Sequence, residues 1–296
     1  MNTITAPVKL QGEARTRSRS SASWRWLQAL SLSAKLGGIG LAAVVLLAIF
    51  GGLIWGANPL TLGSEVLKAP SWAHPMGTDD LGRDVLARVI QGARVSLTVG
   101  VLSALVAAVI GTIVGASAGY AGGAVDSVLM RITELFQVIP RFLLAIVVVA
   151  VYGGGELTVI LVVGSLSWIA TARIVRSRFM VLRKEEFVMA ATMSGASTYR
   201  VITRHILPNV APYLIVSVFL QMGATILIES ILSFIGLGNP ERPSWGLLLQ
   251  QSQLYLQTAW WMTLFPGVAL SLTILSLNLL GDSLSGHSGQ PRTQRH

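Results

Sequence analysis

The chain contains no cysteine among its 296 residues, and only 12% of its residues are charged. The absence of cysteine excludes disulfide bridges, thiolate zinc sites, iron–sulfur clusters and a cysteine nucleophile. Soluble domains carry roughly 25% charged residues, so this shortage argues against a soluble enzyme. Hydrophobic residues make up 52% of the chain and occur in long runs without a charge. This composition predicts a polytopic membrane protein.

Catalytic and cofactor motifs are missing as well. No Gly-Lys dipeptide occurs, so the chain lacks the loop that cradles nucleotide phosphates in P-loop proteins. The histidines His74, His205, His287 and His296 are not at metal-ligand spacing. We expect no catalytic residue, no metal site and no cofactor in this chain. The formal net charge is +9, but the basic residues do not form a stripe interleaved with aromatic residues. We therefore expect no nucleic-acid partner.

Six segments are apolar and long enough to form transmembrane helices, which predicts an all-α fold. In the second segment Gly111, Gly115 and Gly119 recur every four residues, where they would allow close helix packing. The predicted spans are 36–56, 95–118, 128–151 with a kink at Pro140, 157–172, 206–228, and 260–280. Pro208 and Pro212 suggest that the helix of the fifth span starts only near Ala211. Residues 95–282 form a five-span core in this scheme, with polar tails at 1–35 and 283–296.

Most of the Lys and Arg residues fall in the segments 1–35, 173–210 and 283–296. Cytoplasmic loops of membrane proteins carry an excess of these residues. The distribution therefore predicts that both termini and the loop 173–210 lie in the cytoplasm. The loop 57–94 is then expected on the opposite side of the membrane.

The loop 173–210 contains a predicted short helix over 186–193. Glu186 lies at the positive N-terminal end of this helix, and Gly195 follows it, where a left-handed conformation can end a helix. A second amphipathic stretch runs over 198–206 and is followed by Pro208. The small residues Ala190 and Ala191 would suit a helix that lies in a groove of another protein. Periodicity alone allows a plain connector equally well.

Glu229 is a carboxylate inside apolar sequence near the end of the fifth predicted span. Ionisable residues within a membrane are functional candidates, and this one would suit the coupling of an ion to transport. The alternative is that Glu229 pairs with another residue or extends toward the membrane interface.

Two sequence blocks resemble a known family. Ala190, Ala191, Gly195, Leu207 and Pro208 match the spacing Glu-Ala-Ala, three residues, Gly, nine residues, Ile-x-Leu-Pro of permease subunits of ATP-binding-cassette importers. Met189 and His205 depart from that signature. The block from His74 to Arg88, with Gly92 to Leu97, Gly119-Tyr120, Asp126, Ile139-Pro140-Arg141 and Leu232 to Gly238, resembles the C-type permeases of the dipeptide, oligopeptide and nickel group.

The resemblance implies a subunit of the bacterial inner membrane that conducts di- or oligopeptides, or alternatively nickel or a metal chelate. It implies a homologous B-type permease, two ATPase subunits that bind ATP and Mg²⁺, a periplasmic or lipid-anchored binding protein, and contact with membrane lipid. The implied coupling residues are Glu186, Ala190, Ala191, Gly195 and Pro208. The alternative hypothesis, from a different class of function, is an ion-coupled secondary carrier that uses Glu229.

The charged cluster of Asp79, Asp80, Arg83 and Asp84 lies in the loop 57–94. Thr78 or Asp79 would cap a helix that begins near Asp80, and Arg83 would pair with Asp79 or Asp80. The functional alternative is contact with the binding protein or closure of an outer gate.

Overall fold

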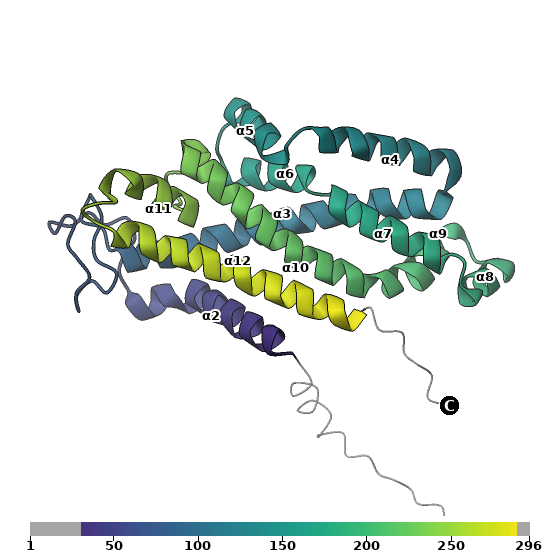
Figure 1. Cartoon of the computed structure of the whole chain (residues 1–296), viewed down its shortest axis with the longest axis horizontal. Coiled ribbons are helices and arrows are strands. Elements are labelled where there is room, and N and C mark those ends of the chain that lie inside the picture. Colours follow the sequence, from purple (N-terminus) through teal and green to yellow (C-terminus); the bar gives the residue numbers. More distant parts are fainter. Residues whose placement is uncertain (1–30, 289–296) are drawn as a thin grey trace, which may run out of the picture.

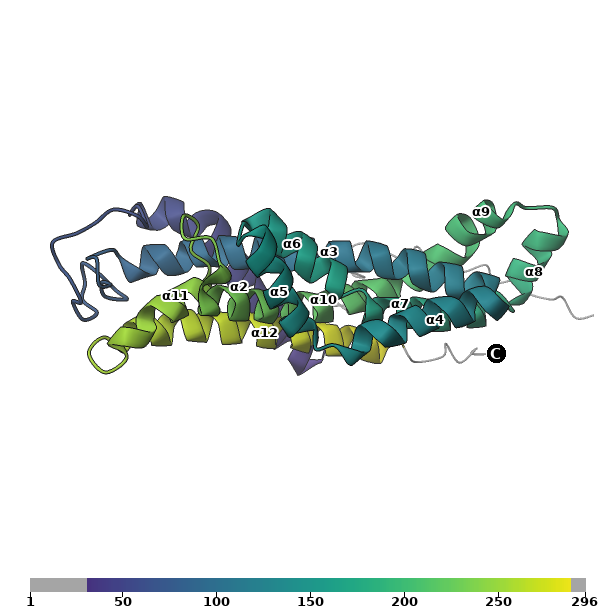
Figure 2. The same cartoon turned by 90° about the horizontal axis from the view of Figure 1, so that it is seen from above.

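A computed structural model describes residues 31–288, and in this part of the chain the regular structure is helical apart from one isolated bridge between Thr78 and Asp84. The helices form an elongated bundle (Figures 1 and 2). Their bounds are α2 Leu32–Trp55, α3 Val85–Ala121, α4 Gly123–Val138, α5 Arg141–Tyr152, α6 Glu156–Leu166, α7 Ile169–Leu182, α8 Glu186–Met193, α9 Thr198–Arg200, η2 Val201–Ile206, α10 Leu207–Leu232, η3 Ser233–Leu237, α11 Trp245–Ser252, η4 Gln253–Tyr255 and α12 Trp261–Ser288.

Helix α3 is the central element and packs against α2, α6, α7 and α10. Its three regularly spaced glycines face α7, as the sequence predicted. A Cβ atom on Gly111 would lie 2.7 Å from the carbonyl oxygen of Trp168, and one on Gly119 would lie 2.6 Å from that of Arg176. Helix α3 also begins at Val85, ten residues before the predicted span. It begins there because the side chain of Asp84 accepts a hydrogen bond from the Ala87 amide and caps the helix.

Two of the predicted spans are broken helices. The pair α4 and α5 is bent by 80° at Ile139 and Pro140, which is a much larger bend than the predicted kink. The pair α6 and α7 is bent by 42°. Helix α7 continues to Leu182, so the predicted loop that starts at residue 173 is wrong for its first ten residues. Arg176 stabilises this extension by a bidentate ion pair with Asp126 of α4, with N–O distances of 2.5 and 2.7 Å.

The fifth span does not start near Ala211 as the prolines suggested. Helical structure runs from Thr198 to Ile235, and Gly236, with a φ of +90°, breaks it within η3. The segment η2 has π-helical geometry, in which the amide of Leu207 donates to the carbonyl of Ile202, five residues earlier. This wider turn accommodates Pro208, which stands in the first turn of α10 where its missing N–H costs little. Pro208 is therefore inside a continuous helix and does not end a loop.

The first and last helices lie antiparallel, with the start of α2 against the end of α12. A Cβ atom on Gly37 would lie 2.8 Å from the carbonyl oxygen of Ser276. Both ends of the described chain are thus on the same side of the bundle. The predicted tail boundaries at 35 and 283 shift to 31 and 288, and the rest of both predicted tails, 1–30 and 289–296, lies outside the described residues.

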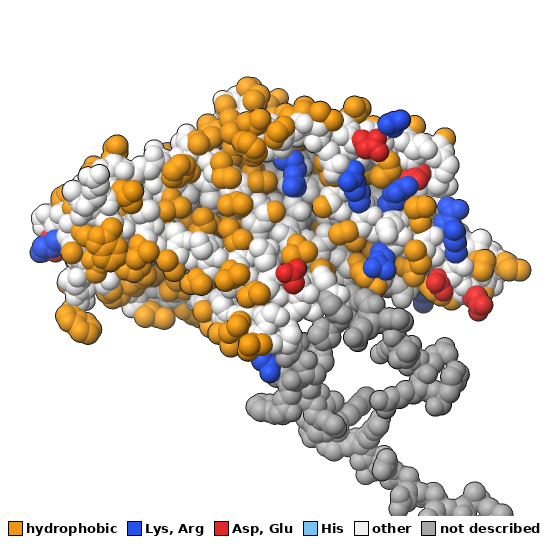
Figure 3. Space-filling model, in the orientation of Figure 1, with side chains coloured by type: hydrophobic (Ala, Val, Ile, Leu, Met, Phe, Trp, Pro, Cys, Tyr) orange, Lys and Arg blue, Asp and Glu red, His pale blue; other side chains and the backbone are white. Residues whose placement is uncertain are grey.

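Four helical segments are long and apolar enough to cross a membrane, and six segments are if each bent pair counts as one span. Charged side chains gather on the half of the surface over α4, α7 and α8, whereas the other half of this face is largely hydrophobic (Figure 3). The fold is therefore that of a polytopic membrane protein, with a charged end that carries α8.

Candidate coupling and gate sites

Helix α8 has the predicted bounds, Glu186–Met193, and it ends at the predicted turn, where Gly195 has a φ of +79°. One face of α8 is anchored by Val188, which is 3% exposed. Val188 belongs to a buried cluster with Val175 and Phe179 of α7, Val201 and Ile206 of η2, and Val210 of α10. Helix α8 is therefore packed, through Val188, on α7 and on the long helix formed by η2 and α10.

The rest of the α8 surface is largely exposed within residues 31–288. Helix α8 projects from one end of the bundle (Figure 2). Its large apolar side chains Phe187, Met189 and Met193 are 44%, 48% and 89% exposed. Glu186 and Ala190 are exposed as well, and Ala191 is half-buried. An apolar helix face at a charged end of the molecule is the kind of surface that docks into a groove of another protein.

At the other end of the bundle, Asp79 is the centre of a buried network. It is 1% exposed and accepts hydrogen bonds from the amides of Leu81 and Arg83. It also accepts from Arg83 Nε at 2.7 Å and from Arg88 Nη1 at 2.5 Å. Arg88 is itself 3% exposed and donates through Nη2 to Gln251. This network ties the loop to α3 and to the helix α11.

Asp84 is the second buried carboxylate of this cluster. Besides capping α3, it accepts a hydrogen bond from Trp55 Nε1 at 3.1 Å and lies 2.8 Å from His74 Nδ1. His74 also lies 3.7 Å from Glu65, whose pKa is lowered by its hydrogen bond to Lys68. The helix cap is thus Asp84, and the predicted cap at Thr78 or Asp79 is wrong.

The remaining two members of the cluster are only partly buried. Arg83 pairs with Asp79, as predicted, and with Asp80 at the longer distance of 3.8 Å. Because Asp79 and Asp84 are buried and fully engaged within the chain, only Asp80 and Arg83 retain surface for a partner. The geometry favours a structural role for the two buried acids.

Glu229 is 3% exposed, so its side chain is enclosed within the bundle. Its carboxylate accepts from the hydroxyl of Ser233 at 2.6 Å and from Ser96 and Ser230 at 3.4 Å. Ser96 also accepts a hydrogen bond from the backbone amide of Trp245. No cation pairs with Glu229 within the described part of the chain. The carboxylate therefore joins α3, α10, η3 and α11 through hydroxyl groups.

Sequence reasoning missed three of these partners: Arg88, Gln251 and the serines around Glu229. Arg88 follows Asp84 by four residues near the start of α3. The signal that the sequence offered for its role was this charged position on the helix face that packs inward. Gln251 is more than 160 residues from Arg88, and no local pattern connects them. Among the described residues, no group of three or more metal-ligating side chains comes together.

The bundle of long, apolar and partly broken helices, with α8 projecting from one end, defines an integral membrane protein, the class to which transport permeases belong. Residues 107–291 match the family described as Binding-protein-dependent transport system inner membrane component. The chain belongs to this family, and it is a multi-pass membrane permease.

Relatives of the chain match most of its length. The dipeptide transport system permease protein DppC of Alkalihalophilus pseudofirmus is 38% identical over 255 residues, which cover 84% of each chain. DppC of Bacillus subtilis is 40% identical over 217 residues, 73% of this chain and 68% of the relative. The oligopeptide transport system permease protein OppC of Escherichia coli K12 is 44% identical over 212 residues, 71% of this chain and 70% of the relative.

Proposed function

We propose that this chain forms half of the translocation pathway of an ATP-binding-cassette importer for di- and oligopeptides. The observation that carries the proposal is the similarity to dipeptide and oligopeptide permeases across most of the chain. The exposed apolar face of α8 supports the coupling part, since it offers a surface on which an ATPase subunit can dock. A homologous B-type permease would complete the pathway, and a periplasmic or lipid-anchored binding protein would deliver the cargo.

Coupling would proceed through the buried cluster beneath α8. ATP and Mg²⁺ would be bound by the partner ATPases, and closure of their dimer would shift α8. Val188 would pass that shift to Phe179 of α7 and Val201 of η2, with which it packs. Because α7 and the helix that contains η2 run deep into the bundle, a small displacement at α8 can alternate the openings of the pathway.

We propose an orientation with α8 and both termini in the cytoplasm and the network around Asp79 outside. The excess of Lys and Arg in the segments that would face the cytoplasm supports this orientation. Asp80 and Arg83 would be the members of the outer cluster that can meet the binding protein, while Asp79 and Asp84 would hold the gate region in shape.

Gly195→Val tests the coupling part of the proposal. Its φ of +79° is strained for a β-branched residue, although open space surrounds the Cα. We expect the variant complex to assemble in the membrane but to take up labelled dipeptide at less than about a tenth of the wild-type rate, since the turn seats α8. Gly153→Val, in the turn between α5 and α6, is the matched control, since Gly153 also has a positive φ of +92° and open space where a Cβ would stand.

The same assay with labelled nickel distinguishes the cargo classes. Loss of dipeptide uptake alone supports a peptide importer. Loss of nickel uptake alone would indicate that the cargo is a metal or its chelate, with the proposed architecture unchanged. Wild-type uptake of dipeptide by Gly195→Val would contradict the assignment of α8.

Glu229→Gln tests the ion-coupled alternative. The amide keeps the size of the side chain and can still accept hydrogen bonds from Ser233 and Ser96, so we expect uptake to stay within about threefold of wild type. Depletion of ATP with the ion gradients maintained should abolish uptake in both proteins. A secondary carrier would show the opposite pattern, with uptake that survives ATP depletion and fails in Glu229→Gln.

A further inference from the structure

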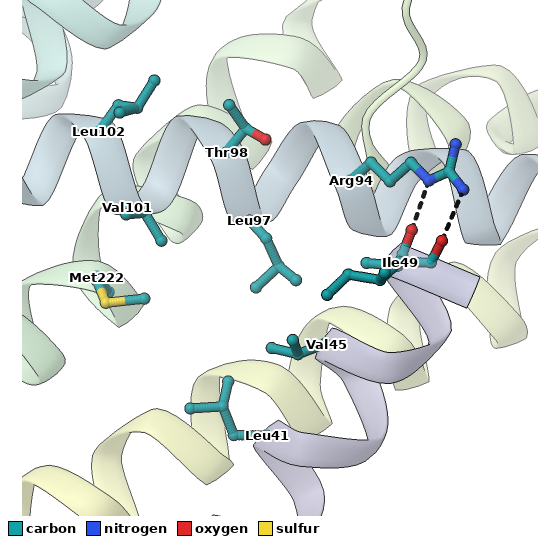
Figure 4. Close-up of a pocket in the computed structure, with 10 residues that line it drawn as sticks. Leu41, Val45, Ile49, Arg94, Leu97, Thr98, Val101, Leu102 and Met222 are labelled. Carbon is teal, nitrogen blue, oxygen red and sulfur yellow. Dashed lines mark hydrogen bonds between the residues drawn. The ribbon is translucent and has the colours of Figure 1, made fainter. Parts of the chain in front are cut away.

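The break between α4 and α5 lines a hollow of about 380 Å³. Its walls are formed by Gln137, Ile139, Pro140 and Arg141 of the first broken span and by Ile169 and Ala170 of the second. The two helix breaks therefore meet at one place in the bundle. This hollow contains polar side chains, in contrast to the larger apolar hollow between α2, α3 and α10 shown in Figure 4.

The hollow lies within the apolar length of the molecule. Trp168, next to its wall residue Ile169, packs its carbonyl against Gly111 of α3. Gly111 is close to the middle of the charge-free run from residue 95 to 125. A charged side chain at this depth is costly unless it faces a polar cavity or a partner of opposite charge.

Arg141 is such a side chain, and the structure shows it exposed without a hydrogen bond or ion pair in the described chain. Arg94 differs from Arg141 in its contacts. Arg94 borders the apolar hollow and donates to the backbone carbonyls of Ala48 and Ile49 (Figure 4), so its charge is already accommodated. Arg141 has no such acceptor.

The groups around Arg141 are hydrogen-bond donors rather than acceptors. The side-chain oxygen of Gln137 is occupied by Arg173 Nη2 at 2.6 Å, which leaves the Gln137 amide nitrogen for a ligand. Arg173 itself forms no ion pair with a described acidic residue. No Asp or Glu lines the hollow. Arg141 and the amide nitrogen of Gln137, in a hollow without an acid, form a set that favours an anion, and a planar carboxylate matches the guanidinium fork.

We propose that this hollow binds the C-terminal carboxylate of the peptide cargo during its passage, and that Arg141 is the residue that recognises it. The inference rests on the proposed function, because the cargo supplies the carboxylate. Recognition at this point would add a selection inside the membrane to that made by the binding protein. Cargo without a free carboxylate would pass without this contact.

The test uses the assembled complex in proteoliposomes, with ATP and saturating binding protein, and compares uptake of labelled Ala-Ala and of Ala-Ala amide. We expect Arg141→Gln to lower kcat/KM for Ala-Ala by about tenfold and Arg141→Lys by no more than about threefold. Uptake of the amide should be equal in wild type and Arg141→Gln. Because the same binding protein delivers each probe to both permeases, its own preference for one probe does not affect this comparison. Arg131→Gln is the control, since Arg131 is an exposed residue of α4 that pairs only with Glu134.

Five outcomes would overturn the inference. Unchanged Ala-Ala uptake in Arg141→Gln would show that the residue does not meet the cargo. Equal losses in the Gln and Lys variants, or equal losses for both probes, would show a role that is independent of the carboxylate. Failure of Arg141→Gln to assemble with the partner permease would make Arg141 an interface residue. Absence of Ala-Ala uptake by the wild-type complex would overturn the proposed function itself, and the inference with it.

Discussion

Replacement of Asp79 by Ala is expected to destabilise the outer loop and the adjoining part of the bundle by about 3–5 kcal/mol. The substitution removes the carboxylate that pairs with Arg83 and Arg88. Arg88 is 3% exposed, so its guanidinium would be left as a buried charge with only Gln251 as an acceptor. The amides of Leu81 and Arg83 would lose their acceptor too. The loss should be measured by thermal unfolding of the purified complex and by the rate of proteolysis in the loop 57–84.

Asp80→Ala is the matched control for this prediction. Asp80 carries the same charge in the neighbouring position, but its side chain is 28% exposed and its contact with Arg83 is 3.8 Å long. Exposed ion pairs of this kind contribute about 0–1 kcal/mol. If Asp79→Ala were no more destabilised than Asp80→Ala, the loop would not depend on the buried network.

The second large effect is expected at the exposed face of α8. Met193 is 89% exposed, and we expect it to be buried when an ATPase subunit docks. Burying a Met side chain contributes about 1.5–3 kcal/mol, so Met193→Glu should weaken binding of the ATPase by roughly tenfold to a hundredfold. Co-purification of the ATPase with the permease pair, followed by a titration in detergent, would measure the change.

Leu254→Glu provides the control, because Leu254 is 88% exposed but lies beyond α11 at the opposite end of the bundle. Its substitution introduces the same charge on an equally exposed apolar side chain. Binding of the ATPase should be unchanged in this variant. Equal affinities for the Met193 and Leu254 variants would place the docking surface somewhere other than α8.

Helix α8 and its turn were predictable because local chemistry decides them. An acidic first turn and a glycine that can adopt a positive φ act within a few residues, so both the helix and its end are legible in the sequence. The same holds for the glycines of α3, whose spacing places them on one helix face. Apolar length likewise indicated the membrane spans.

The prolines before α10 were misleading for a physical reason, whereas the kink predicted at Pro140 is confirmed. Pro140 was expected to kink a helix, and it stands at a break of 80°. Pro208 and Pro212 were expected to delay the start of a helix, yet η2 widens to π geometry and the helix continues. A missing N–H can be accommodated by a local change of helix type or by a break, and packing against neighbouring helices decides which occurs.

By itself, the sequence determined the class of protein, the helix α8 with its turn, and the charged cluster that begins at Asp79, since each follows from composition or from spacing along a few residues. Only the tertiary structure decided which charges are buried and what they contact. Asp79 pairs with Arg88, which also donates to Gln251, Glu229 is surrounded by serines, and Arg141 faces a hollow without an acid. These outcomes depend on contacts between helices that are far apart in the sequence. The local pattern of residues in one segment does not show which distant helix packs against it.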